Sequence, residues 1–108
     1  MGSYNLNNLF PKPAFYRGSA VSDQRLTVDA TAGGVQLSAF NDITNMVVLD
    51  VQDADVMCTF DGSAPTSTNG HRLYSGSHFT WSTATAAAAK FIRQGSTSAS
   101  IQASEFQL

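Results

Sequence analysis

Residues 55–71 read D-V-M-C-T-F-D-G-S-A-P-T-S-T-N-G-H, and this stretch decides the fold of the chain. In residues 56–60 every second side chain is apolar (Val, Cys, Phe), which is the period of a β-strand with one buried face. The alternation ends at residue 60. Asp61-Gly62 then favours a tight turn, because glycine accepts a positive φ. Pro65 prevents a helix, and Gly70 allows the chain to re-enter a strand. The stretch therefore predicts a strand, a shaped polar loop and a return strand.

Short segments with the same period lie on both sides of this stretch. Strands are expected at residues 25–29, 35–39, 46–51, 71–74, 78–83, 91–93 and 101–105. The run 46–51 is the most apolar, and we expect it to be buried on both faces. Residues 84–89 have high helix propensity and allow one or two helical turns at most. About seven or eight short strands with polar turns predict an all-β fold, an antiparallel β-sandwich of jelly-roll or immunoglobulin-like type.

The N-terminal stretch differs from the rest of the chain. Pro11 and Pro13 favour an extended backbone, so residues 1–20 are predicted to form an extended N-terminal arm and residues 21–108 the sandwich domain. The arm carries four aromatic side chains, Tyr4, Phe10, Phe15 and Tyr16. That much apolar area must be buried somewhere, either on another protein or on the end of the chain's own sandwich.

Composition narrows the classes of function. Only 13% of the residues are charged, against about 25% in an average soluble domain. Uncharged polar groups are cheaper to desolvate than charges, which suits a surface pressed against a partner. The six basic residues are scattered, so we expect no nucleic-acid partner. No apolar run has the length of a membrane span, and we expect neither a membrane partner nor a signal peptide.

The sequence offers few residues for chemistry. Cys58 is the only cysteine and is expected to be a buried thiol. His71 and His78 lack the spacing of metal ligands, and the acidic residues of 50–55 are interpreted as a solvated turn and not a calcium loop. There is no nucleophile elbow and no glycine-rich phosphate loop. We therefore expect no enzyme activity, cofactor, metal or small-molecule substrate.

Two pairs of side chains allow a different interpretation. Trp81 with Phe79, or Tyr74 with His71, would form an aromatic platform for a sugar. A tryptophan within an alternating strand is more often a core residue, so core packing is the preferred interpretation of Trp81. An immunoglobulin-like carbohydrate-binding module stays as an alternative.

Residues 56–71 and 91–99 together resemble a family of small virion proteins of tailed bacteriophages. In that family a strand leads into D-G-x-x-P-T-x-x-x-G-H, and a later F/A-I-R-x-G-S-T-x-A precedes the closing strand. This chain has D-G-S-A-P-T-S-T-N-G-H and F-I-R-Q-G-S-T-S-A in that order. The first motif also occurs in immunoglobulin-like modules of bacterial glycosidases, where it marks a strand and its turn.

The resemblance implies a structural role. It predicts a capsid cement or decoration protein on the outer surface of the phage head, assembled in the host cytoplasm, which bridges neighbouring major capsid protein subunits as a homotrimer. The alternative within the virion is a tail, neck or fibre adaptor. The aromatic residues of the arm are the predicted anchors, and the loop is the second predicted contact surface through Ser63, Pro65, Thr66, Asn69 and His71.

Overall fold

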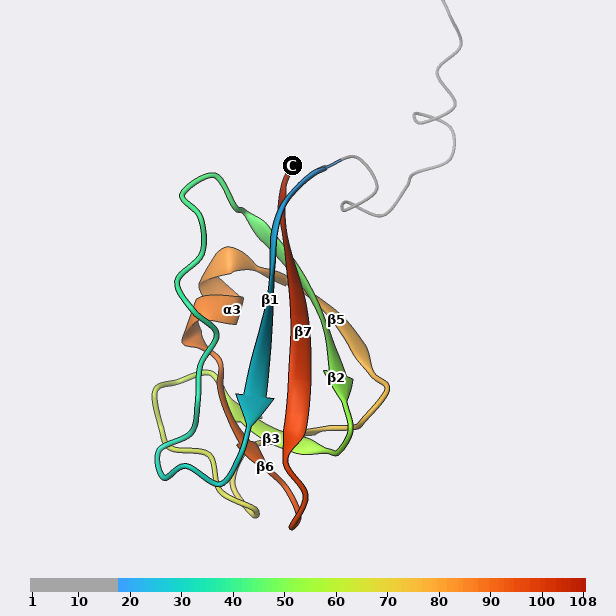
Figure 1. Ribbon diagram of the computed structural model, residues 1–108. Helices are drawn as coiled ribbons and strands as arrows, with labels where there is room; N and C mark the ends of the chain where they lie inside the picture. Colours follow the sequence, from blue (N-terminus) through green and yellow to red (C-terminus); the bar gives the residue numbers. More distant parts are fainter. Residues whose placement is uncertain (1–17) are drawn as a thin grey trace, which may run out of the picture.

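The structure, a computed structural model, describes residues 18–108 as two antiparallel sheets packed face to face (Figure 1). The four-stranded sheet has the order β1 (Ser19–Val28), β7 (Ala99–Gln107), β2 (Met46–Gln52), β5 (His78–Ser82). The three-stranded sheet has the order β4 (His71–Leu73), β3 (Val56–Thr59), β6 (Lys90–Arg93). The predicted all-β antiparallel sandwich is confirmed. The predicted arm anchors Tyr4, Phe10, Phe15 and Tyr16 lie outside the described residues.

The core lies between the two sheets and follows the alternation of the sequence. In β7 every second residue is buried, from Ala99 through Ile101 and Ala103 to Glu105. This strand pairs with β1 along one edge and with β2 along the other, so it is a central strand of its sheet. The largest fully buried side chain is Phe91 of β6, which faces it from the opposite sheet.

Burial of the two central strands differs from the sequence expectation. Residues 46–51 are not buried on both faces, because Val48 and Asp50 are half-exposed on the outer face of the four-stranded sheet. All four residues of β3 are buried instead. The loop after β3 folds back on the strand, where Thr59 Oγ1 donates a hydrogen bond to the Ser63 carbonyl at 2.6 Å. The loop therefore helps to cover Thr59, which the alternation of the sequence alone did not predict to be buried.

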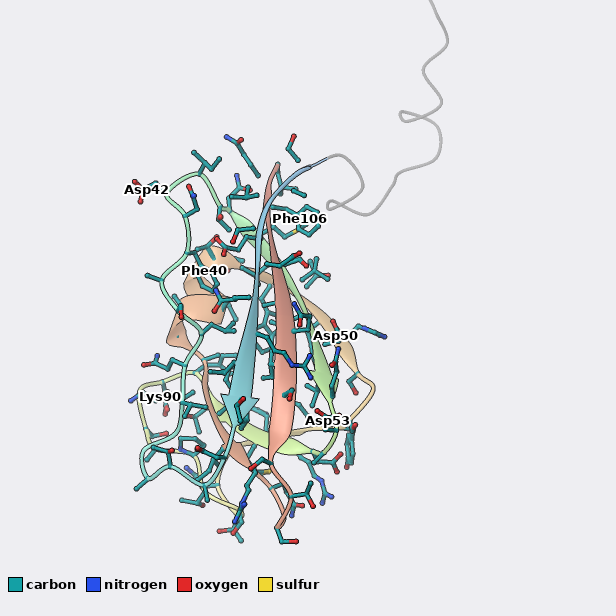
Figure 2. The ribbon with its side chains drawn as sticks, viewed as in Figure 1. Phe40, Asp42, Asp50, Asp53, Lys90 and Phe106 are labelled. Carbon is teal, nitrogen blue, oxygen red and sulfur yellow. The ribbon has the colours of Figure 1, made fainter. Side chains whose placement is uncertain are left out.

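The strand expected at residues 35–39 does not form. Val35 alone pairs with β6, through reciprocal backbone hydrogen bonds with Phe91 of 2.7 and 2.8 Å. The side chain of Gln24 then exchanges two hydrogen bonds with the backbone of Ser38, at 2.8 and 3.2 Å. The segment therefore crosses from β6 to β1 and closes that side of the sandwich (Figure 1). Phe40 of the same segment lies beside the helix (Figure 2).

The helix α3 (Thr83–Ala88) connects β5 to β6 and has the short length expected from the sequence. Ser82 is its N-cap and accepts a hydrogen bond from the Thr85 N–H at 3.2 Å. Among residues 18–108 no helix is long and apolar enough to cross a membrane. The first strand begins at Ser19, two residues before the expected start of the domain.

Glu105 is a buried carboxylate that fixes the connection before β2. Its Oε1 atom accepts hydrogen bonds from the Asn41 N–H at 2.9 Å and from Thr44 Oγ1 at 2.8 Å, and the residue is 3% exposed. Glu105→Ala leaves the buried Thr44 hydroxyl and the Asn41 N–H without their acceptor, so we expect a loss of about 2 kcal/mol in the free energy of unfolding. Glu105→Gln keeps an acceptor oxygen and should lose less. Urea unfolding of both variants measures the difference, and equal losses would contradict this role.

Candidate binding surfaces

The polar loop of residues 61–70 is held by its own hydrogen bonds. The Oδ1 atom of Asp61 accepts from both the N–H and the Oγ of Ser63, at 3.0 and 2.6 Å. Further along, Thr66 Oγ1 accepts from the Asn69 N–H at 2.9 Å. The expected turn at Gly62 is confirmed by its φ of +87°. The loop is therefore shaped before any partner arrives, which reduces the entropy that a contact would cost.

Four of the five predicted loop residues are exposed, namely Ser63, Thr66, Asn69 and His71. Pro65 is the exception, because its side chain is fully buried. A Cβ atom on Gly34 would lie 2.9 Å from Pro65 Cγ, which shows how closely the two residues pack. Pro65 therefore fixes the loop from its inner side, and its burial leaves the exposed part of the predicted contact surface to the other four residues.

The two sequence motifs meet in space. Residues 64–67 of the first motif and residues 92–95 of the second line one groove of about 470 Å³, closed on its third side by the turn around Gly33. We call it the motif groove. The two motifs are thus parts of one end of the molecule, although β4, β5 and α3 lie between them in the chain.

A second groove lies between β4 and β5, the edge strands of the two sheets. Its volume is about 380 Å³, and its rings come from Phe60, His71, Tyr74, Phe79 and Trp81. We call it the aromatic groove. The Trp81 ring lies 5.2 Å from Phe60 in an edge arrangement and 5.6 Å from Phe79, measured between ring centroids. Rings at these distances and angles attract one another, so these three side chains hold each other in place along the groove.

Trp81 belongs to both the core and this groove. Its ring is nearly parallel to that of buried Phe91, with centroids 6.3 Å apart, yet the residue is only half-buried and lines the groove. Tyr74 is 59% exposed at the rim. The sequence paired Trp81 with Phe79 and Tyr74 with His71, and the structure brings all four together. The sequence did not indicate Phe60 as a groove residue, because the alternation of residues 56–60 predicted that this ring lies in the core.

Arg72 at the rim is neutralised and held in place. Its Nε and Nη2 atoms donate to Asp55 Oδ2 at 3.1 and 2.8 Å, and its guanidinium lies 5.2 Å from the Tyr74 ring centroid. The other oxygen of Asp55 accepts from the Ser75 N–H at 2.8 Å. The Ser75 hydrogen bond and then Arg72 lower the pKa of the Asp55 carboxyl. The groove is therefore bordered by a fixed pair of opposite charges.

Because of this pair, the free energy of unfolding depends on pH in the acid range. Because the folded-state pKa of Asp55 is lowered, its contribution is complete above the unfolded value near pH 4 and is lost as the pH falls through the folded value. We expect Asp55→Asn to destabilise the protein at neutral pH and to differ much less from the wild type at about pH 2. Urea unfolding of both proteins at the two pH values measures this. A difference that stays constant with pH would contradict the assignment.

The residues considered for metal binding are dispersed. Asp53 lies directly after β2 (Figure 2), in a turn where its φ is +74°. Its carboxylate forms a 3.5 Å ion pair with Arg25. Within residues 18–108 no group of three or more His, Cys, Asp or Glu side chains is placed to hold a metal ion. Burial raises the pKa of the Cys58 thiol to about 12. That thiol is buried, as expected from the sequence, and is therefore a poor nucleophile.

Comparisons with protein-family models, with curated proteins and with solved structures found no match to this chain.

Proposed function

We propose that the protein is a structural component of a bacteriophage virion, a capsid cement or decoration protein that bridges neighbouring major capsid subunits. The observation that carries the proposal is the motif groove. Two motifs that resemble those of small virion proteins converge there on one end of a β-sandwich. In this proposal that end, with the loop residues Ser63, Thr66 and Asn69, faces the capsid.

The physical character of this end supports a contact role. Its exposed residues at positions 63–69 are uncharged and short, so their desolvation costs little. The loop is held in one shape before binding, because Asp61 and Thr66 bond to its backbone N–H groups. A preformed, neutral surface loses little free energy to ordering or to ion desolvation when it meets a large partner.

The N-terminal segment extends the same proposal. Its aromatic residues Tyr4, Phe10, Phe15 and Tyr16 would anchor on adjacent capsid subunits. A homotrimer would present three such segments, and tethering turns each later contact into an intramolecular one. Weak individual contacts then hold subunits together against the pressure of packaged DNA.

Counting copies in purified particles tests the position in the virion. A decoration protein repeats with the capsid lattice, so quantitative mass spectrometry should find on the order of hundreds of copies per particle. About a dozen or fewer would favour the tail, neck or fibre adaptor instead. Absence of the protein from purified particles would overturn both.

Binding to particles that lack the protein tests the surface. Ser67 lines the motif groove and is exposed, so Ser67→Arg should weaken binding by placing a long charged side chain at the contact. Thr27→Arg is the matched control, because Thr27 is an exposed residue of β1 in the other sheet. We expect the control to bind like the wild type. Equal binding by both variants would exclude the motif groove as the capsid contact.

A further inference from the structure

The two long sides of the sandwich differ in whether another segment of the chain covers them. The side between β1 and β6 is closed by the segment that carries Val35 and Ser38. On the opposite side, β4 and β5 are edge strands, and no other strand within residues 18–108 pairs with their outer edges. The aromatic groove lies on this open side, where Tyr74 is exposed and the rings of Phe60, Phe79 and Trp81 are half-buried.

The edge of β5 offers backbone groups to an extended chain. The Val51 N–H donates to the Ser77 carbonyl at 3.0 Å, which sets the alternation of the ladder between β2 and β5. Because hydrogen-bonded and non-hydrogen-bonded pairs alternate, the backbone groups of His78 and Thr80 point away from β2. The strand has no proline, lysine or glutamate that would block another strand. An extended peptide can therefore bind this edge while its side chains enter the groove.

The N-terminal segment has the chemistry that this site needs. Its apolar residues Tyr4, Leu6, Leu9 and Phe10 are of the kind that an aromatic groove binds. It also contains Lys12 and Arg17, and no acidic residue precedes Asp23. All eight acidic residues of the chain therefore lie in the body, which has an excess of negative charge. Segment and body attract each other by charge as well as by apolar area.

The segment is long enough to reach the groove of its own chain. Strand pairing places Ala20, Phe106, Met46 and Ser82 in one row across the four-stranded sheet. Three strand spacings along this row and three residues back along β5 to Phe79 make a path of about 24 Å. About eight extended residues cover that distance. Counted back from Ser19, they bring Phe10 close to the groove, with Leu9 and Leu6 beyond it.

We propose that residues 4–10 of the N-terminal segment occupy the aromatic groove of their own chain while the protein is free in solution. The segment and the groove then cover each other's apolar surface until a partner competes for the segment. This inference goes beyond the proposed function and does not depend on it. It would hold for the free protein whether the partner is a capsid or another assembly.

Trp81 is the only tryptophan of the chain, so its fluorescence reports on the groove directly. The test compares the full-length wild type with the triple variant Leu6→Ser, Leu9→Ser, Phe10→Ser. We expect the variant to show a red-shifted emission maximum and stronger quenching by acrylamide. The matched control is Phe15→Ser with Tyr16→Ser, which removes two rings only four and three residues before Ser19, fewer than the about eight residues that the path to Phe79 requires. Its emission should equal that of the wild type.

Three results would overturn the inference. One is equal quenching of Trp81 in the wild type and the triple variant. Another is wild-type emission that changes with protein concentration together with the mass in light scattering, which would assign the segment to a second copy. The last is a saturable response to cellotriose or chitotriose that is equal in the wild type and the triple variant, which would identify an open glycan site. None of these results bears on the number of copies in particles.

Discussion

Replacing Gly70 with alanine is expected to lower the free energy of unfolding by about 3 kcal/mol or more, because two separate costs combine. Gly70 has a φ of +130°, a backbone conformation that side-chain-bearing residues rarely adopt. A Cβ atom there would also lie 2.8 Å from the carbonyl oxygen of Cys58. That oxygen belongs to the central strand of its sheet, so it has no room to move.

Gly62→Ala is the matched control, since Gly62 lies at the other end of the same loop. Its φ is +87°, but a Cβ atom there meets nothing within 4 Å. Only the backbone strain remains, so we expect a loss of about 1 kcal/mol. Urea unfolding followed by circular dichroism measures both variants. Equal losses would show that the approach to Cys58 contributes nothing.

Much of the first motif is explained by the fold. Asp61 holds Ser63, Gly62 takes a positive φ, Pro65 packs on Gly34, and Gly70 passes close to Cys58. These are roles that any sandwich with this loop requires. The motif therefore reports the shape of one end of the molecule, and its exposed residues between these positions are the ones available for the proposed capsid contact.

The sequence was sufficient for the strands whose partners enforce a simple alternation. In β7, buried Ile101, Ala103 and Glu105 fall on one face as expected. It was insufficient at residues 35–39, where the same alternation produces a single bridge at Val35. The pattern there reflects a segment that covers the core at Leu37 while crossing between sheets. Periodicity records which side chains are buried, and it does not record whether the backbone has a neighbouring strand to pair with.

The candidate site was only partly predictable for a similar reason. The sequence indicated Trp81, Phe79, Tyr74 and His71, because aromatic residues in alternating strands are visible as such. It gave no sign that Phe60 joins them, since that contact depends on how the two sheets align. The fixed pair of Arg72 and Asp55 was also missed, because the residues lie seventeen positions apart and meet only through the pairing of β3 with β4.

Phe91→Ala is expected to cost about 3 to 5 kcal/mol, the usual range for truncating a buried phenylalanine. Phe91 is fully buried, pairs with Cys58 in β3 and bridges to Val35, so neighbouring side chains have little freedom to fill the cavity. A domain of this size has a total stability of about 5 to 15 kcal/mol, so the variant loses a large fraction of it. Urea unfolding followed by circular dichroism measures the loss.

The same substitution separates the core from the aromatic groove. Trp81 stacks on Phe91 from one side and lines the groove on the other, so removing Phe91 should change Trp81 emission in the native state as well as stability. Ile92→Ala is the matched control, because Ile92 is the next residue, half-buried on the opposite face beside the motif groove. We expect it to cost about 1 kcal/mol and to leave Trp81 emission unchanged. If both variants altered the emission equally, Trp81 would be sensing global loosening of the sandwich, and its use as a specific reporter of the aromatic groove would have to be abandoned.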